Sequence, residues 1–182
     1  MGLDMYLEAE EYVGGWDHCK PEERARYAAF LELSGLKGLA CKGSPSLEVS
    51  VPVAYWRKAN AIHGWFVENV QGGKDECQKS HVSRGKMQEL LDVVNQVLSV
   101  TETMDGQVHV GTRWQNGITE ELYEPGQVAA NPAVAKRLLP TSSGFFFGGT
   151  DYDEGYINDL KRTKAILEVA VKDEYGEYYY YS

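Results

Sequence analysis

The stretch VAYWRKANAIHGWF, residues 53–66, marks the point where a strand pattern gives way to a helix pattern. Upstream, LEVSVPVAY (47–55) alternates in a way that predicts a strand, and Pro52 within it indicates an edge position or a bulge. From Trp56 to about Val70, apolar residues recur with the helical period. The stretch therefore predicts a strand that leads directly into an amphipathic helix.

The predicted helix has one apolar face, formed by Trp56, Ala59, Ile62, Phe66, Val67 and Val70. At about 100° per residue, His63 falls within that face and Asn60 lies at its margin. Trp65 falls nearly opposite, beside Lys58. We therefore expect most of the aromatic residues here to be core, with one tryptophan left on the basic side.

The remaining segments give strand and helix signals in an irregular order. Strands are expected within residues 2–13, 77–83, 143–154 and the tyrosine-rich tail 174–182, and helices within 21–35, 83–99 and 132–139 and after the capping pair Thr150 and Asp153. About four helices on a mostly antiparallel sheet predict an α+β fold, with residues 1–182 in a single domain.

Residues 101–130 differ from the rest of the chain. They contain short alternating runs and the turn pairs Asp105-Gly106 and Asn116-Gly117. Such pairs between alternating segments predict a β-hairpin, with QVHVGTRW (107–114) as one arm. We expect an insertion of hairpin type at about 101–130.

The net charge of −9 argues against general nucleic-acid binding, which needs a basic surface to neutralise phosphates. No apolar run approaches the roughly 20 residues that span a bilayer. The first residues carry acids where a signal peptide has a basic region, and the three cysteines cannot all pair within one chain. We expect a cytoplasmic protein with reduced thiols.

The junction between strand and helix is the first candidate binding site. A helix N-terminus attracts anions, and Arg57 and Lys58 add full positive charges there. Tyr55, Trp56 or Trp65 would stack on a flat ring, and the combination suits a nucleotide or an acidic protein segment. The alternative is that the aromatic residues are core and the cations are solvated.

His63 has two interpretations. Among apolar neighbours it is a core histidine with its hydrogen bonds satisfied, or it contacts a ligand or acts as an acid–base group. Asn60, three positions earlier, would then orient the ring.

A second candidate site lies in GGTDYDE (148–154). Asp151, Asp153 and Glu154 are clustered carboxylates of the kind that hold a divalent cation. Helix capping explains Thr150 and Asp153 without any ligand, so both alternatives stay open and no cofactor is expected.

Four long segments carry a resemblance: MGLDMYLEA, YWRKANAIHGWFVENVQGGKDEC, VSRGKMQELLDVVNQVL and LLPTSSGFFFGGTDYDEGYINDLKRT. In these the chain resembles a family of small uncharacterised proteins from bacteriophages, prophages and bacteria. The resemblance implies provenance more than mechanism. Its recurring motifs fall on residues 55–65 and 144–154, and residues 101–130 fit it poorly.

Three functions follow as hypotheses. The leading one is a phage or prophage accessory protein that binds, sequestering a nucleotide-type host defence signal or occluding a host protein. The second is a metal-dependent hydrolase or transferase with His63 as acid–base group and Asp151 or Asp153 at the cation. The third is a protein-interaction module whose tyrosine-rich tail adds as an edge strand to a partner or to a second copy.

Overall fold

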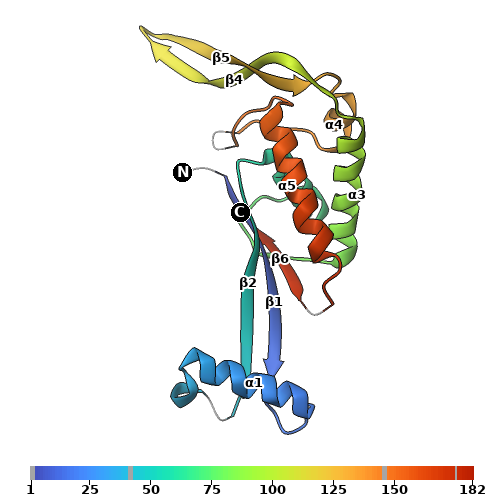
Figure 1. The fold of residues 1–182 in the computed structure, drawn as a ribbon. Coiled ribbons are helices and arrows are strands. Elements are labelled where there is room, and N and C mark those ends of the chain that lie inside the picture. The colour runs from blue at the N-terminus through green and yellow to red at the C-terminus, as the bar shows by residue number, and fades with distance from the viewer. Residues whose placement is uncertain (1–2, 41–42, 145–146, 175) are drawn as a thin grey trace.

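The computed structural model describes residues 3–40, 43–144, 147–174 and 176–182, which form a single α+β domain (Figure 1). Its main sheet has four antiparallel strands in the order β2-β1-β6-β3. The strands are β1 (Asp4–Gly14), β2 (Ser46–Arg57), β3 (Ser80–Val82) and β6 (Glu177–Tyr181). The predicted fold class is confirmed.

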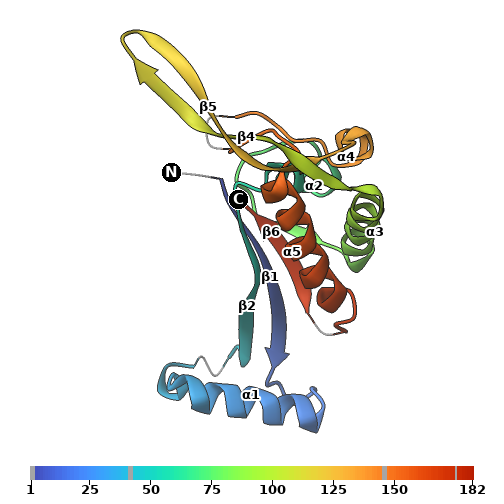
Figure 2. The same cartoon turned by 45° about the horizontal axis from the view of Figure 1, so that its top comes forward.

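All helices but the first gather along one side of this sheet, and α5 packs against α3 (Figures 1 and 2). The helices are α1 (Pro21–Ser34), α2 (Asn60–Asn69), α3 (Arg84–Val100), α4 (Ala133–Leu138) and α5 (Glu154–Ala170), with a short 3₁₀ turn η1 (Lys37–Leu39). Helix α1 lies at the far end of the β1–β2 ribbon, away from the other helices. No helix in the described ranges has the length and apolar character needed to cross a membrane.

The core lies between the sheet and helices α2, α3 and α5. The helices predicted within 83–99 and after Thr150 and Asp153 are present as α3 and α5, and each buries one apolar face, with Met87, Leu90, Val94, Leu160 and Leu167 all fully buried. Ser83 caps α3, because its hydroxyl accepts a hydrogen bond from the Lys86 amide at 3.2 Å.

Strand β2 is one of the two edge strands of the sheet, and its register against β1 shifts beside Pro52. Leu7 pairs with Ala54 while Glu8 pairs with Pro52, so Val53 is the extra residue of a bulge. Both parts of the prediction for Pro52 are confirmed. An edge strand suits proline because one row of its backbone groups needs no partner.

The predicted start of α2 at Trp56 is wrong. Trp56 still belongs to β2, which ends at Arg57, and is buried in the core, and the helix begins only at Asn60. The chain turns at Lys58, whose φ of 61° belongs neither to a strand nor to a right-handed helix. This turn separates the two periodic patterns that the sequence places side by side.

The tyrosine-rich tail is an interior strand. Strand β6 pairs with β1 on one side and with β3 on the other, and both Tyr178 and Tyr180 are buried. The hypothesis that the tail adds as an edge strand to a partner is therefore contradicted, because β6 has no free edge to offer.

The predicted hairpin is present as β4 (Thr103–Gln115) and β5 (Ile118–Ala129). Asn116 and Gly117 form its turn with φ of 54° and 78°, the conformation that makes Asn-Gly a hairpin pair. The pair Asp105-Gly106, expected as a turn, lies within β4 instead. The hairpin projects from the body at the end opposite α1 (Figures 1 and 2).

The strand predicted within 143–154 is not found in the described part of that segment. Residues 147–152 are turn and coil, and Asp153 makes an isolated bridge with Val128. The prediction rested on Phe145, Phe146 and Phe147, of which the first two lie outside the described residues.

Candidate functional site

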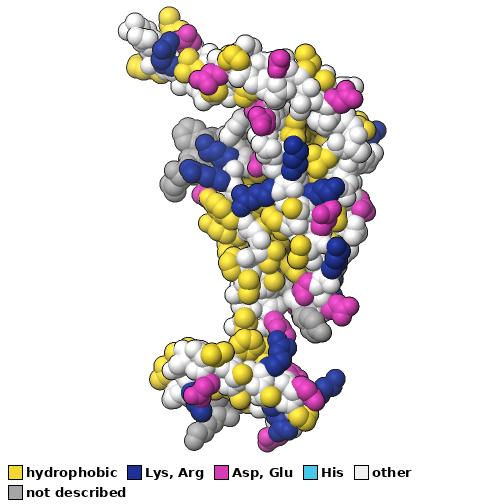
Figure 3. All heavy atoms as spheres, viewed as in Figure 1, with side chains coloured by type: hydrophobic (Ala, Val, Ile, Leu, Met, Phe, Trp, Pro, Cys, Tyr) yellow, Lys and Arg dark blue, Asp and Glu magenta, His cyan; other side chains and the backbone are white. Residues whose placement is uncertain are grey.

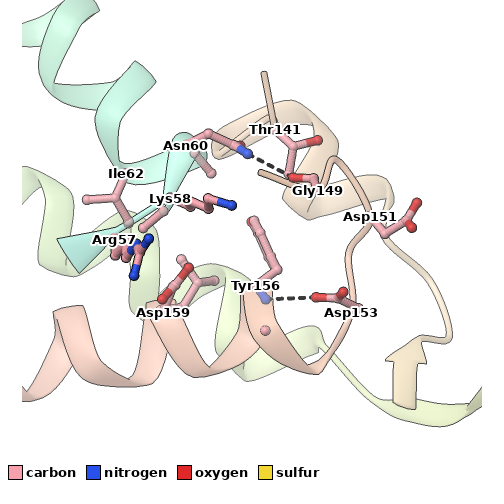
Figure 4. Close-up of a pocket in the computed structure, with 14 residues that line it drawn as sticks. Arg57, Lys58, Asn60, Ile62, Thr141, Gly149, Asp151, Asp153, Tyr156 and Asp159 are labelled. Atoms are coloured by element: carbon pink, nitrogen blue, oxygen red, sulfur yellow. Dashed lines mark hydrogen bonds between the residues drawn. The ribbon is translucent and has the colours of Figure 1, made fainter. Parts of the chain in front are cut away.

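A cavity of about 290 Å³ lies where the end of β2 and the start of α2 meet the start of α5 (Figure 4). Arg57, Lys58 and Asn60 line it from one side, and Asp151 and Asp153 from the other. These residues are about 90 positions apart in sequence. The two separately predicted candidate sites therefore face one cavity.

Lys58 directs its side chain into this cavity from the β2–α2 turn (Figure 4). Its backbone is held in the left-handed region by a hydrogen bond from its amide to the Leu3 carbonyl, 2.7 Å, and by one from the Asn60 amide to its own carbonyl, 2.9 Å. A lysine in that region carries strain of about 1 kcal/mol or more. Backbone strain of this kind clusters at functional sites, where it fixes the direction of a side chain.

The two cations of the cavity lack acidic partners. Arg57 and Lys58 are both exposed, and neither forms an ion pair with a described residue. Beside them, the amides of Ala61 and Ile62 belong to the first turn of α2 and have no acceptor among the described residues. In a chain of net charge −9, two cations without an ion pair therefore lie at the N-terminus of a helix, where an anion is favoured.

Asn60 holds the cavity together and is not a free ligand-binding group. Its side-chain Nδ2 donates to the carbonyl oxygens of Phe147, 3.0 Å, and Gly149, 2.8 Å. Its Oδ1 accepts from the Ser142 amide at 3.0 Å, and the side chain is buried. Asn60 thus fixes the loop that leads to α5 against the start of α2.

Three carboxylates line the cavity in different ways. Asp153 caps α5, because its Oδ1 accepts from the Tyr156 amide at 2.9 Å, while the Asp151 carboxylate points away from the cavity (Figure 4). Asp159 lies one turn into α5, where burial raises its carboxyl pKa from 3.8 to about 6. Sequence reasoning missed Asp159; its signal is an acid beside the buried positions Ile157 and Leu160 of a helix.

Tyr156 forms another wall and is held by its hydroxyl, which donates to the Leu139 carbonyl at 3.0 Å (Figure 4). Burial raises the pKa of this phenol, so the hydroxyl stays protonated and acts as a donor. Thr163, fully buried one layer deeper, accepts from the Trp56 indole Nε1 at 2.9 Å and donates to the Asp159 carbonyl at 2.7 Å.

The aromatic residues predicted to stack on a ligand lie elsewhere. Trp56 is 1% exposed and presents no free ring face, and Tyr55 lies outside the cavity with its hydroxyl donating to Asp4 at 2.5 Å. Trp65 is 9% exposed and lines a second cavity, together with Leu139 and Phe147. The expectation that Trp65 lies beside Lys58 on the basic side of α2 is wrong, because Trp65 is buried and lines the second cavity, whereas Lys58 lines the first.

His63 lines the second cavity, of about 410 Å³, and is 2% exposed. Its Nδ1 lies 2.7 Å from the Tyr180 hydroxyl and its Nε2 lies 3.0 Å from Asp75 Oδ2. Burial raises the pKa of the Tyr180 phenol, so its hydroxyl keeps its proton and can donate to Nδ1, while a proton on Nε2 can be donated to Asp75. His63 is thus a core histidine with both nitrogens satisfied.

The metal-site interpretation gains no support from this geometry. Within the described ranges, no group of three or more His, Cys, Asp or Glu side chains is placed to hold a metal ion. His63 and the acids Asp151 and Asp153 line different cavities. Glu154 is exposed in the first turn of α5, where an acid favours the helix dipole without a ligand.

A scan of protein-family models finds no match to this chain, and neither do searches of curated proteins and of solved structures.

Proposed function

We propose that this chain is a binding protein that holds a small anionic molecule of nucleotide type in the cavity between β2, α2 and α5. In this proposal it is a phage or prophage accessory protein that sequesters a host defence signal. The observation that carries the proposal is the pair of unpaired cations, Arg57 and Lys58, at a cavity of about 290 Å³. That volume is at the lower end of small-molecule pockets, which suits a ligand of about mononucleotide size.

The charges around the cavity restrict the ligand further. The two cations Arg57 and Lys58 share the cavity with the acids Asp153 and Asp159. The several negative charges of a triphosphate would be repelled by those acids. A ligand with one negative charge would be repelled less, and its uncharged hydrogen-bond donors could bind the two carboxylates. We therefore favour a singly charged ligand such as a cyclic mononucleotide over a polyphosphate.

Binding without turnover agrees with the side chains present. The described residues that line the cavity include no His, Cys or Ser, and the one histidine predicted to act in catalysis faces the second cavity. An activated nucleophile needs a base within hydrogen-bond reach, and Thr141, the aliphatic hydroxyl among these residues, donates to the Thr150 carbonyl at 2.8 Å instead.

Native mass spectrometry of the full chain tests the proposal with three probes: a 3′,5′-cyclic mononucleotide, a 5′-mononucleotide and a nucleoside triphosphate. We expect a one-to-one complex whose retention falls in that order, and whose retention is lost in Arg57→Ala/Lys58→Ala. Lys164→Ala on α5 is the matched control, since Lys164 is a cation away from the cavity. Equal binding to the double variant and the wild type would refute the proposal.

A further inference from the structure

The β4–β5 hairpin forms an arm attached to the body only at its base. There the Ala129 amide donates to the Tyr152 carbonyl at 2.8 Å, and the Ala130 amide donates to the Glu102 carbonyl at 2.8 Å. Farther out, every residue from 112 to 121 is exposed. The outer arm is thus a single layer with both faces uncovered (Figures 1 and 2).

The tip of this arm carries large apolar side chains. Trp114 is 73% exposed and Ile118 is 69% exposed, on either side of the Asn116-Gly117 turn. A two-stranded ribbon is only marginally stable in water, so these side chains do not form a core of their own. Exposed tryptophans at such a position are typical of interface anchors.

The two apolar residues point in opposite directions. Trp114 pairs with Thr119, whereas Ile118 pairs with Gln115, so Trp114 and Ile118 belong to opposite faces of the ribbon. A flat partner surface would cover one of them. A cleft that receives the tip would cover both.

The arm is also acidic. Its two strands carry one Lys or Arg residue, Arg113, which pairs with Glu120 at 2.6 Å. They carry four acids: Asp105, Glu120, Glu121 and Glu124. Figure 3 shows acidic side chains interspersed with hydrophobic ones along its surface. A second copy of the arm would bring like charges together, and acidic edge strands disfavour pairing with themselves. The charge likewise excludes a nucleic acid and favours a basic protein.

We infer that the arm is a docking element that inserts its tip into an apolar cleft, ringed by Lys and Arg side chains, on a partner protein. Trp114 and Ile118 fill the cleft from the two faces, and the acids on β5 meet the basic rim. This interaction is separate from the ligand cavity, because neither residue lines it.

A peptide selection tests this inference. The biotinylated full chain is used to enrich binders from a random library of disulfide-cyclised peptides, and each binder is then measured against variants. We expect enriched peptides to combine Lys or Arg with apolar residues, and to lose at least tenfold in affinity for Trp114→Ser/Ile118→Ser and for Glu120→Lys/Glu121→Lys/Glu124→Lys. Leu33→Ser, which removes another exposed apolar side chain on α1, should leave the affinity unchanged.

Several outcomes overturn the inference: no enrichment, enriched peptides without basic residues, or equal binding to Trp114→Ser/Ile118→Ser. Sedimentation of the wild type is a further test. A wild-type dimer that becomes a monomer in Trp114→Ser/Ile118→Ser would show that the tip binds a second copy of this chain, which would also overturn the inference. A photo-crosslinking residue at position 114 in the otherwise unchanged chain guards against misfolding of the variants. It should label the bound peptide, and the same residue at position 33 should not.

Discussion

The side chain of Asn60 donates a hydrogen bond to the carbonyl oxygen of Gly149, 2.8 Å away and 89 positions later in the chain. The same amide also bonds Phe147 and Ser142, so one residue at the start of α2 fixes three points of the loop before α5. The cavity exists because that loop is held across Lys58.

Replacing Asn60 by alanine should therefore destabilise the protein and abolish ligand binding together. Three hydrogen bonds are lost, and backbone groups of the loop are left without partners, so we expect a loss of about 2 to 4 kcal/mol in the free energy of unfolding. Urea denaturation measures it. Asn69→Ala on the same helix, which removes a single bond to the Trp65 carbonyl, should cost under about 1 kcal/mol. Equal losses in the two variants would refute the role assigned to Asn60.

Two substitutions of Lys58 separate the effect of its backbone strain on stability from the effect of its charge on ligand binding. Lys58→Gly removes the cation and relieves the backbone strain at a φ of 61°, so we expect it to stabilise the protein by about 1 kcal/mol while it weakens ligand binding. Lys58→Ala removes the cation but keeps the strained conformation, and should weaken binding without that gain. Thermal unfolding and a binding titration of both variants give the comparison. If Lys58→Gly were the less stable of the two, the strain would be absent.

Asp159 should make stability depend on pH. Its folded pKa of about 6 lies above the unfolded value of 3.8, so the folded state binds more protons between these values, and its contribution to stability falls as pH rises from about 4 to about 6. Because Asp159 is partly exposed, we expect a loss of about 1 to 2 kcal/mol, less than the full shift implies.

Asp159→Asn should therefore gain stability over the wild type at pH 7 and show no such gain at pH 4. Denaturation at the two pH values measures the difference, and Asp92→Asn on α3 serves as the exposed control. The same titration should strengthen binding of an anionic ligand as pH falls through 6, because the carboxylate beside the cavity loses its charge. A pH-independent difference between variant and wild type would contradict this account.

Deleting residues 177–182 should unfold the protein, because β6 is the interior strand that joins β1 to β3 and supplies Tyr180 to the core. In contrast, shortening the arm by replacing residues 107–125 with a tight turn should leave the body folded, since the outer arm does not pack against it. Circular dichroism and a melting curve distinguish the unfolded tail deletion from the folded arm deletion. A folded tail deletion would contradict the sheet order.

Local periodicity was sufficient to predict the helices that bury one face. The α3 and α5 patterns required no knowledge of the partner, and the Asn-Gly turn of the hairpin has its own local cause. The start of α2 was missed because it depends on the turn at Lys58, which a hydrogen bond to Leu3 stabilises from 55 positions away.

The site was predictable in part for the same reason. Arg57 and Lys58 stand out locally as cations at a helix start, but their meeting with Asp153 and Asp159 depends on the packing of α5. The burial of Trp65 likewise depends on residues 138–142, which cover a side of α2 that the helical period alone leaves open. The tail was expected at an edge of the sheet, and its burial depends on pairing with β1 and β3, which are distant in sequence.

The most direct test of the central claim is an amide NMR titration of the full chain with a 3′,5′-cyclic mononucleotide. Our account predicts saturable shifts at Ala61, Ile62 and Gly149, which surround the cavity, and their loss in Arg57→Ala/Lys58→Ala. Shifts confined to the second cavity around His63 and Trp65, or the same shifts in the double variant, would contradict it.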